Sequence, residues 1–269
     1  MSEQDERAAM ARKTVVHEMP GMDAVTVERD RAYGSSDDGP LTFDLYRPPA
    51  PIDRPPPGRL PATLFVLGFV DPMFARGLKE TGGYTSWGRL VAASGSIAIT
   101  YSYRDPVADL DALLRHLRDN AAALGIDETR MAVWAGSGNG PMALSLLMRE
   151  AAGAFRCAAL LYPFLLDTAD ATHVADASRL FRFANPCAGR SLDDLSPELP
   201  LFVVRAGRDA PQLNQTIDAF LAGALARNLP VSFTNHATGP HAFDLLDDSE
   251  ISREIVRRVL AFLRFHLLA

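Results

Sequence analysis

The sequence predicts an α/β fold, in which a mainly parallel, twisted sheet of about eight strands carries helices on both faces. Short continuous apolar runs such as Thr63–Gly68 are typical of strands that are buried on both faces. These runs alternate with stretches of helical periodicity. The clearest is Val107–Leu124, with apolar residues at 110, 113, 114, 117, 121 and 124. Repeated alternation of this kind favours parallel strands joined by crossover helices.

The elements are expected to begin with an antiparallel hairpin. Val25–Arg29 and Leu41–Tyr46 both alternate at period two, and the turn residues Gly34–Gly39 separate them. The proline-rich segment Pro48–Pro61 should form a surface connection, because proline cannot enter a central strand. Strands are then expected at Thr63–Gly68, Ser96–Thr100, Met131–Ala135, Cys157–Leu161, Leu201–Arg205 and Val231–Thr234, and helices at Tyr84–Ala93, Val107–Leu124, 141–152, Leu213–Arg227 and Ile251–Leu268.

The chain is expected to form one domain. Its 269 residues are within the size that α/β folds reach as single units. Residues 1–20 are predicted to be a polar N-terminal leader, and residues 21–269 a single α/β domain. A small irregular insertion is expected at about 164–199, where no clean period occurs. Such an insertion after a strand lies near the ligand crevice of this kind of sheet, although an ordinary long connection is the alternative.

Composition limits the classes of partner and compartment. The net charge of −6 argues against nucleic acid and against an anionic membrane surface as partners. No run of 18 apolar residues is present, so no membrane span is predicted. The N-terminus has no apolar core, and Cys157 lies in an apolar run where it is expected to be a buried small hydrophobe. These features favour the cytoplasm and leave the oligomeric state open.

Neither a metal nor an organic cofactor is predicted. No His/Cys/Asp group has metal-ligand spacing. The segment Gly136–Gly140 resembles a dinucleotide loop only superficially, because its G-x-G-x-x-G pattern is incomplete and lies deep in the chain.

A serine surrounded by small residues follows one of the predicted strands. In Val133–Ala143 an apolar run leads to Ser137, and a helix-forming stretch begins soon afterwards. A sharp strand-to-helix turn holds such a serine in a strained backbone conformation, and small neighbours let the strand and the helix approach closely. The N-terminus of the next helix supplies unpaired N–H groups and partial positive charge, which suit an oxyanion.

This serine motif departs from the usual G-x-S-x-G pattern. With Ser137 as the nucleophile, Ala135 and Asn139 stand where glycines are usual. The frame Gly136–Gly140 keeps both outer glycines but puts a glycine at the nucleophile position. We favour the Ser137 frame, because Ala135 is still small and Gly140 restores a small residue one step later. A turn without chemistry is the alternative for so short a segment.

Two later segments offer the partners that a nucleophilic serine needs, a base and a group that orients the base. Asp209 comes just after the predicted strand Leu201–Arg205, and His241 follows the last short strand. Both should therefore lie on loops at the carboxyl edge of the sheet, where the crevice of such folds is found. His236 is the main rival for the base, and Asp167 is the rival for the acid.

The order Ser, Asp, His and the positions after strands resemble the α/β-hydrolase superfamily, in its esterase/lipase and dienelactone-hydrolase-like branch. The resemblance extends over nearly the whole chain. It is carried by the serine turn, by the early hairpin Leu41–Pro48, by the acid turn Ala206–Asp209 and by the histidine loop Gly239–Phe243. It implies the α/β-hydrolase fold.

The resemblance also implies roles for particular residues. Ser137 would be the nucleophile, His241 the general base and acid, and Asp209 the carboxylate that orients the histidine. The oxyanion hole would use the backbone N–H groups of Gly138 and of Phe69, with Val70 left open as an alternative to Phe69.

The predicted function is a carboxylesterase-like serine hydrolase that cleaves a small-molecule ester through an acyl-enzyme intermediate. One alternative is a non-catalytic α/β-hydrolase-fold protein that binds a ligand or a partner, which Asn139 favours because a larger residue could distort the serine turn. The other alternative is a thioesterase or acyltransferase that uses the same three side chains.

Overall fold

An eight-stranded sheet forms the centre of the computed structural model, which describes residues 3–49, 58–70, 77–167 and 171–268. The strand order is β1-β2-β4-β3-β5-β6-β7-β8. The strands are β1 (Thr26–Ser36), β2 (Gly39–Arg47), β3 (Leu60–Phe65), β4 (Ile97–Tyr101), β5 (Ile126–Gly136), β6 (Cys157–Leu161), β7 (Leu201–Ala206) and β8 (Val231–His236). β1 and β2 form the predicted antiparallel hairpin, and β4, β3, β5, β6, β7 and β8 run parallel.

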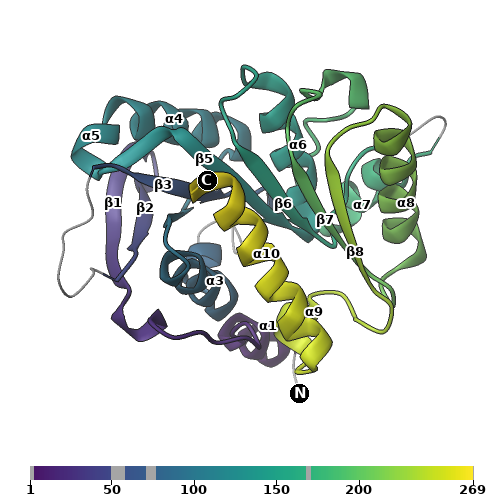
Figure 1. Ribbon diagram of the computed structural model, residues 1–269, viewed down its shortest axis with the longest axis horizontal. Helices are drawn as coiled ribbons and strands as arrows, with labels where there is room; N and C mark the ends of the chain where they lie inside the picture. Colours follow the sequence, from purple (N-terminus) through teal and green to yellow (C-terminus); the bar gives the residue numbers. More distant parts are fainter. Residues whose placement is uncertain (1–2, 50–57, 71–76, 168–170, 269) are drawn as a thin grey trace.

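Helices cover both faces of the sheet (Figure 1). The α-helices are α1 (Glu3–Arg12), α3 (Gly82–Ala93), α4 (Pro106–Asp119), α5 (Ala121–Leu124), α6 (Gly140–Arg149), α7 (His173–Phe181), α8 (Pro211–Ala226), α9 (Phe243–Leu246) and α10 (Glu250–Leu268). Short 3-10 turns are η1 (Met22–Ala24), η2 (Leu78–Glu80), η3 (Ser137–Asn139) and η4 (Leu192–Asp194). The predicted fold class is confirmed.

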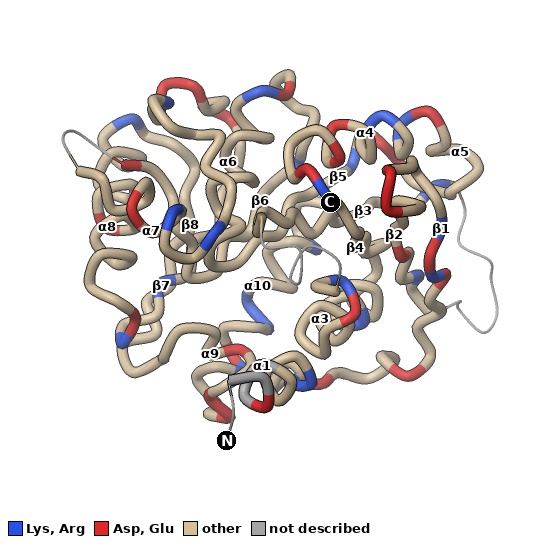
Figure 2. Tube along the Cα trace, turned by 180° about the vertical axis from the view of Figure 1, so that it is seen from behind, with Lys and Arg blue, Asp and Glu red and all other residues tan. Residues whose placement is uncertain are grey.

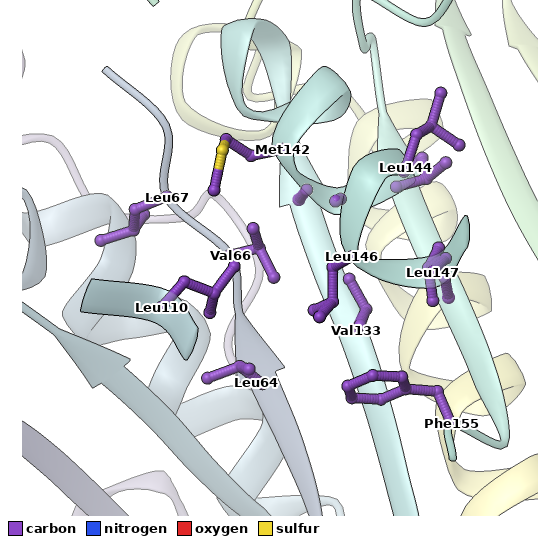
Figure 3. Packing of buried hydrophobic residues seen from close by; sticks show 14 of the residues in the cluster. Leu64, Val66, Leu67, Leu110, Val133, Met142, Leu144, Leu146, Leu147 and Phe155 are labelled. Atoms are coloured by element: carbon purple, nitrogen blue, oxygen red, sulfur yellow. The ribbon is translucent and has the colours of Figure 1, made fainter. Parts of the chain in front are cut away.

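Two hydrophobic cores lie on opposite faces of the sheet. α4, α6 and α8 contribute to one core, and α3 and α10 contribute to the other. Figure 3 shows Met142 and Leu146 of α6 packed towards Val133 of β5 and the end of β3. Because α6 follows β5 directly, this packing fixes the turn between them.

The helix α4 illustrates how local sequence sets the element boundaries. The Asp105 carboxylate accepts hydrogen bonds from the N–H groups of Val107 and Ala108, and Pro106 occupies the first turn. The predicted helix Val107–Leu124 is divided at Asn120 into α4 and α5. Gly125 then ends α5 with a left-handed φ of 65°.

Three segments differ from the sequence-based expectations. Helix α1 occupies much of the polar leader, and α7 lies inside the insertion that was expected to be irregular. Pro61 belongs to the central strand β3, so the expectation that the whole of Pro48–Pro61 lies outside the sheet was wrong. The register with β5 shifts between Leu60 and Ala62, so the residue that lacks an N–H falls at an irregularity of the ladder. Residues 50–57 of that segment and 168–170 of the insertion lie outside the described residues.

Charged residues are interspersed along the helices and the outer hairpin (Figure 2). Among the described residues, no helix is long and apolar enough to span a bilayer. The same part of the chain holds no cluster of three or more His, Cys, Asp or Glu side chains that could bind a metal ion. Cys157 and Cys187 are both buried and carry free thiols.

Candidate active site

The turn between β5 and α6 has the strained geometry that the sequence predicts. Ser137 has a φ of +58°, which an L-residue with a side chain rarely adopts. β5 ends at Gly136 and α6 begins at Gly140, so only the single 3-10 turn η3 separates the strand from the helix. This conformation is typical of a serine held at the apex of a strand-to-helix turn.

Different neighbours exclude a side chain at the two glycines that follow Ser137. A Cβ atom at Gly140 would lie 2.0 Å from the carbonyl oxygen of Phe164, and one at Gly138 would lie 2.7 Å from the Phe183 ring. Asn139 has a φ of −83° and a ψ of −10°, which any residue adopts. Gly138 and Gly140, and not position 139, are therefore the points in this turn where a side chain has no room.

The structure brings Ser137, His241 and Asp209 together in one hydrogen-bonded chain. Ser137 Oγ lies 2.8 Å from His241 Nε2, and His241 Nδ1 lies 2.6 Å from Asp209 Oδ2. Because the Asp209 carboxylate accepts, Nδ1 carries a hydrogen, and Nε2 of the neutral ring accepts from the serine hydroxyl. The Asp209 side chain is 6% exposed whereas the His241 side chain is 41% exposed, so the imidazole is the more accessible of these two partners.

Backbone hydrogen bonds tie the acid turn to the histidine loop. The Gly207 N–H donates to the His236 carbonyl at 2.8 Å, and the Arg208 N–H donates to the Gly239 carbonyl at 3.0 Å. A Cβ atom at Gly207 would lie 2.4 Å from the Ala237 carbonyl oxygen, so glycine permits this close approach. The two loops therefore hold Asp209 and His241 in a fixed relation.

The segment after β3 lies across the turn from Ser137. Its Gly68 N–H donates to Asn139 Oδ1 at 2.8 Å, and its Phe69 carbonyl accepts from the Tyr103 hydroxyl at 2.8 Å. The Val70 N–H donates to the Arg182 carbonyl at 2.8 Å. This bond engages the Val70 N–H, which the sequence-based prediction left open as an alternative to the Phe69 N–H.

An apolar cavity of about 280 Å³ lies beside these groups, and Ser137 and His241 both line it. Its other walls include Phe69, Tyr84, Trp87, Trp134, Tyr162 and Leu245. Met10 and Ala11 of α1 also line it. The polar leader of the sequence-based prediction thus supplies part of the wall of the pocket.

A second buried carboxyl, Asp244, lies behind the histidine. It accepts hydrogen bonds from the Tyr162 hydroxyl at 2.6 Å and from Trp87 Nε1 at 2.7 Å. Burial raises the pKa of Asp244, and these two hydrogen bonds partly oppose that rise. The Tyr162 ring also packs edge-on against His241, with 4.9 Å between ring centroids. Asp244 and Tyr162 therefore support one side of the imidazole.

Neither rival side chain takes part in this arrangement. His236 is buried, and its Nε2 lies 2.9 Å from both Asp247 Oδ2 and Ser252 Oγ. Asp167 accepts hydrogen bonds from the N–H groups of Val174 and Ala175 at the start of α7. His236 therefore links β8 to the start of α10, and Asp167 caps a helix.

Three esterases of known structure have similar folds. For an esterase from Pseudomonas putida the TM-score is 0.66 at 17% identity, with 99% of this chain and 91% of that chain covered. For a thermostable carboxylesterase cloned from a metagenomic library the TM-score is 0.67 at 18% identity, with 99% of this chain and 98% of that chain covered. For an esterase from Rhizomucor miehei the TM-score is 0.67 at 16% identity, with 99% of this chain and 89% of that chain covered. The chain has the α/β-hydrolase fold. Comparison of the sequence with protein-family profiles and with curated proteins gave no match.

The α/β-hydrolase fold explains why residues far apart in sequence meet here. Ser137, Asp209 and His241 follow β5, β7 and β8, whose carboxyl ends share one edge of the sheet. Sequence reasoning assigned no role to the pocket residues Met10, Tyr84 and Asp244. Asp244 could have been noticed from the sequence, because it lies three residues after His241. Only the fold places Met10 and Tyr84 beside the cavity.

Proposed function

We propose that this protein is a serine hydrolase that cleaves carboxylic esters. The observation that carries the proposal is the chain of hydrogen bonds from Ser137 through His241 to Asp209 beside an apolar cavity. The strained backbone of Ser137 supports it, as do the names of the solved structures with similar folds, which are esterases.

In this reaction His241 Nε2 takes the proton of Ser137 while Oγ forms a bond to the ester carbonyl carbon. The carbonyl oxygen becomes an oxyanion, which the backbone N–H groups of Gly138 and Phe69 would stabilise. Collapse of the tetrahedral intermediate breaks the bond to the alkoxy group, and His241 returns the proton to that leaving group. Water then attacks the acyl-serine with the same base, which releases the acid and restores the serine.

The Asp209 carboxylate has an orienting and electrostatic role in this scheme. It accepts the hydrogen bond from Nδ1, which keeps Nε2 as the acceptor towards Ser137, and it stabilises the imidazolium that forms during attack. The non-catalytic alternative is motivated by Asn139. The ordinary backbone angles at this residue argue against a turn distorted by its side chain.

The deciding experiment combines covalent labelling with turnover of p-nitrophenyl acetate. A fluorophosphonate should label the protein once, with the adduct mapped to Ser137 by mass spectrometry. Ser137→Ala should fold normally, resist labelling and lose several orders of magnitude in turnover, about 10⁶-fold where a serine nucleophile acts as part of such a unit. Wild-type-like turnover in that variant, or labelling at another residue, would overturn the proposal.

A further inference from the structure

The side chain of Asn139 connects three separate segments around the pocket. Its Oδ1 accepts from the Gly68 N–H at 2.8 Å, and its Nδ2 donates to the Tyr84 hydroxyl at 2.8 Å. Gly68 belongs to the segment after β3, Tyr84 to α3, and Asn139 itself to the turn that carries Ser137. Asn139 is 2% exposed, so water cannot readily replace either bond.

A glycine at position 139 could make neither contact, because both use the side-chain amide. The steric demand for a small residue falls instead on Gly138 and Gly140. The departure from G-x-S-x-G thus coincides with a side chain whose two ends are both engaged. Backbone conformation does not explain the asparagine at position 139, since φ and ψ at this residue suit any amino acid.

We infer that Asn139 is a positioning residue for ester hydrolysis: it fixes the segment that carries Phe69 relative to Ser137. This inference rests on the proposed function. Gly68 is bonded to Asn139 and is followed directly by Phe69, whose N–H is the proposed second donor to the oxyanion. Asn139 lies two residues after Ser137 in the same turn. The tether therefore sets the separation between the nucleophile and this donor.

The rest of the same segment is held from other directions. The Gly68 carbonyl accepts from the Ala184 N–H at 2.7 Å, and a Cβ at Gly68 would lie 2.5 Å from Met142 Cγ. These contacts join the segment to the insertion and to α6. Among the described residues, the hydrogen bond between the Gly68 N–H and Asn139 Oδ1 is the only one that joins this segment to a side chain of the turn η3. Its loss should shift the segment without unfolding the domain.

The first arm of the test is hydrogen–deuterium exchange of the peptide that contains residues 66–70, which needs no turnover. Asn139→Ala should speed exchange in this peptide and leave β5 and β7 unchanged. Asn139→Gly, which restores the second glycine of the usual motif, should do the same. The matched control is Asn120→Ala, because Asn120 also donates through its side-chain amide, to the His116 carbonyl at the end of α4. Unchanged exchange at 66–70 in both Asn139 variants would overturn the tether.

The second arm is steady-state kinetics with p-nitrophenyl esters. A donor displaced by a fraction of an ångström to an ångström should lower kcat about 10- to 100-fold in Asn139→Ala and Asn139→Gly. KM should change less than about threefold, because an interaction specific to the transition state is lost. Tyr84→Phe removes the hydrogen bond to Asn139 Nδ2 but keeps the one between the Gly68 N–H and Asn139 Oδ1, so it should lower kcat by less. This variant replaces the Asn139 variants if those fold poorly. A wild-type kcat in folded Asn139 variants would overturn the positioning role.

A pair of inhibitors separates misplacement of the donor from general loss of structure. An alkyl trifluoromethyl ketone adds to a nucleophilic serine: Oγ bonds to the carbonyl carbon, the proton passes to the histidine, and the ketone oxygen becomes an oxyanion. Its affinity should fall in Asn139→Ala by the same factor as kcat/KM. The corresponding alcohol, which cannot add, should bind unchanged. Equal weakening of both inhibitors would assign Asn139 a structural role only. If the wild-type protein has no turnover that depends on Ser137, the proposed function fails, while the exchange arm still decides the tether.

Discussion

At the residue scale, two histidines lie at and just after the end of β8, and their surroundings differ. His241 faces Ser137 and the pocket, whereas the buried Nε2 of His236 lies between Asp247 and Ser252. Sequence context favoured His241, but only the fold shows that His236 is engaged elsewhere. The departure at Asn139 could not be interpreted from sequence either, because its partner Gly68 lies 71 residues away.

The first prediction concerns these histidines. His241→Ala should lower kcat by about 10²- to 10⁴-fold, because Ser137 loses its general base. Wild-type activity should fall as the pH is lowered, since a protonated imidazole cannot accept the serine proton. His236→Gln should lose stability yet keep the same pH profile of kcat/KM. If instead the fall in activity at low pH disappeared in His236→Gln and remained in His241→Ala, the role of base would pass to His236.

At the element scale, local periodicity predicted the strands and most helices but missed α1, α7 and the four-residue α9. Helix α1 is polar and only ten residues long, so no apolar stripe marks it in the sequence. Tertiary contacts position the segment that follows α1 instead: the Val15 N–H donates to Ser86 Oγ, and the Val16 N–H donates to the Asp244 carbonyl. A Cβ at Gly82 would lie 2.6 Å from the Lys13 carbonyl oxygen. Such long-range contacts leave no periodic signal.

The second prediction follows from the position of α1 beside the pocket. Ala11→Trp adds a large side chain at the cavity wall, so kcat/KM for octanoate esters should fall about tenfold relative to acetate esters, the size of effect typical of a pocket too small for added methylenes. The matched control is Ala8→Trp, on the same helix but outside the cavity lining. Equal chain-length preference in the two variants would show that α1 does not limit the acyl group.

At the scale of the whole molecule, alternation of strand and helix was enough to predict the sheet and both helical layers. It could not predict the ion pairs that link a buried lysine to the hairpin. Lys79, which is 3% exposed, donates to Asp44 at 2.8 Å and to Asp30 at 2.7 Å. These residues lie on η2, β2 and β1, so the ion pairs join the hairpin to the segment before α3. No sequence pattern pairs residues 35 and 49 positions apart.

The last prediction tests this charge cluster as a contribution to global stability. Burial opposes the charged form of Lys79, but hydrogen bonds to Asp30 and Asp44 raise its pKa. A raised lysine pKa stabilises the folded state at all pH values below the unfolded pKa, and this contribution is lost only as the pH rises through the folded value. Lys79→Met should therefore destabilise the protein equally at about pH 6 and about pH 8.

The expected loss is about 3–5 kcal/mol in urea unfolding, because Lys79→Met leaves the buried Asp44 carboxylate with only the half-exposed Arg29 guanidinium, 3.6 Å away, as a cation. Lys79→Met combined with Asp44→Asn should recover a large part of that loss, since no buried charge then lacks a partner. The surface control is Arg118→Met, which breaks the exposed pair with Glu150 and should cost less than about 1 kcal/mol. A Lys79→Met variant no less stable than Arg118→Met would mean that the cluster does not hold the hairpin to the rest of the domain.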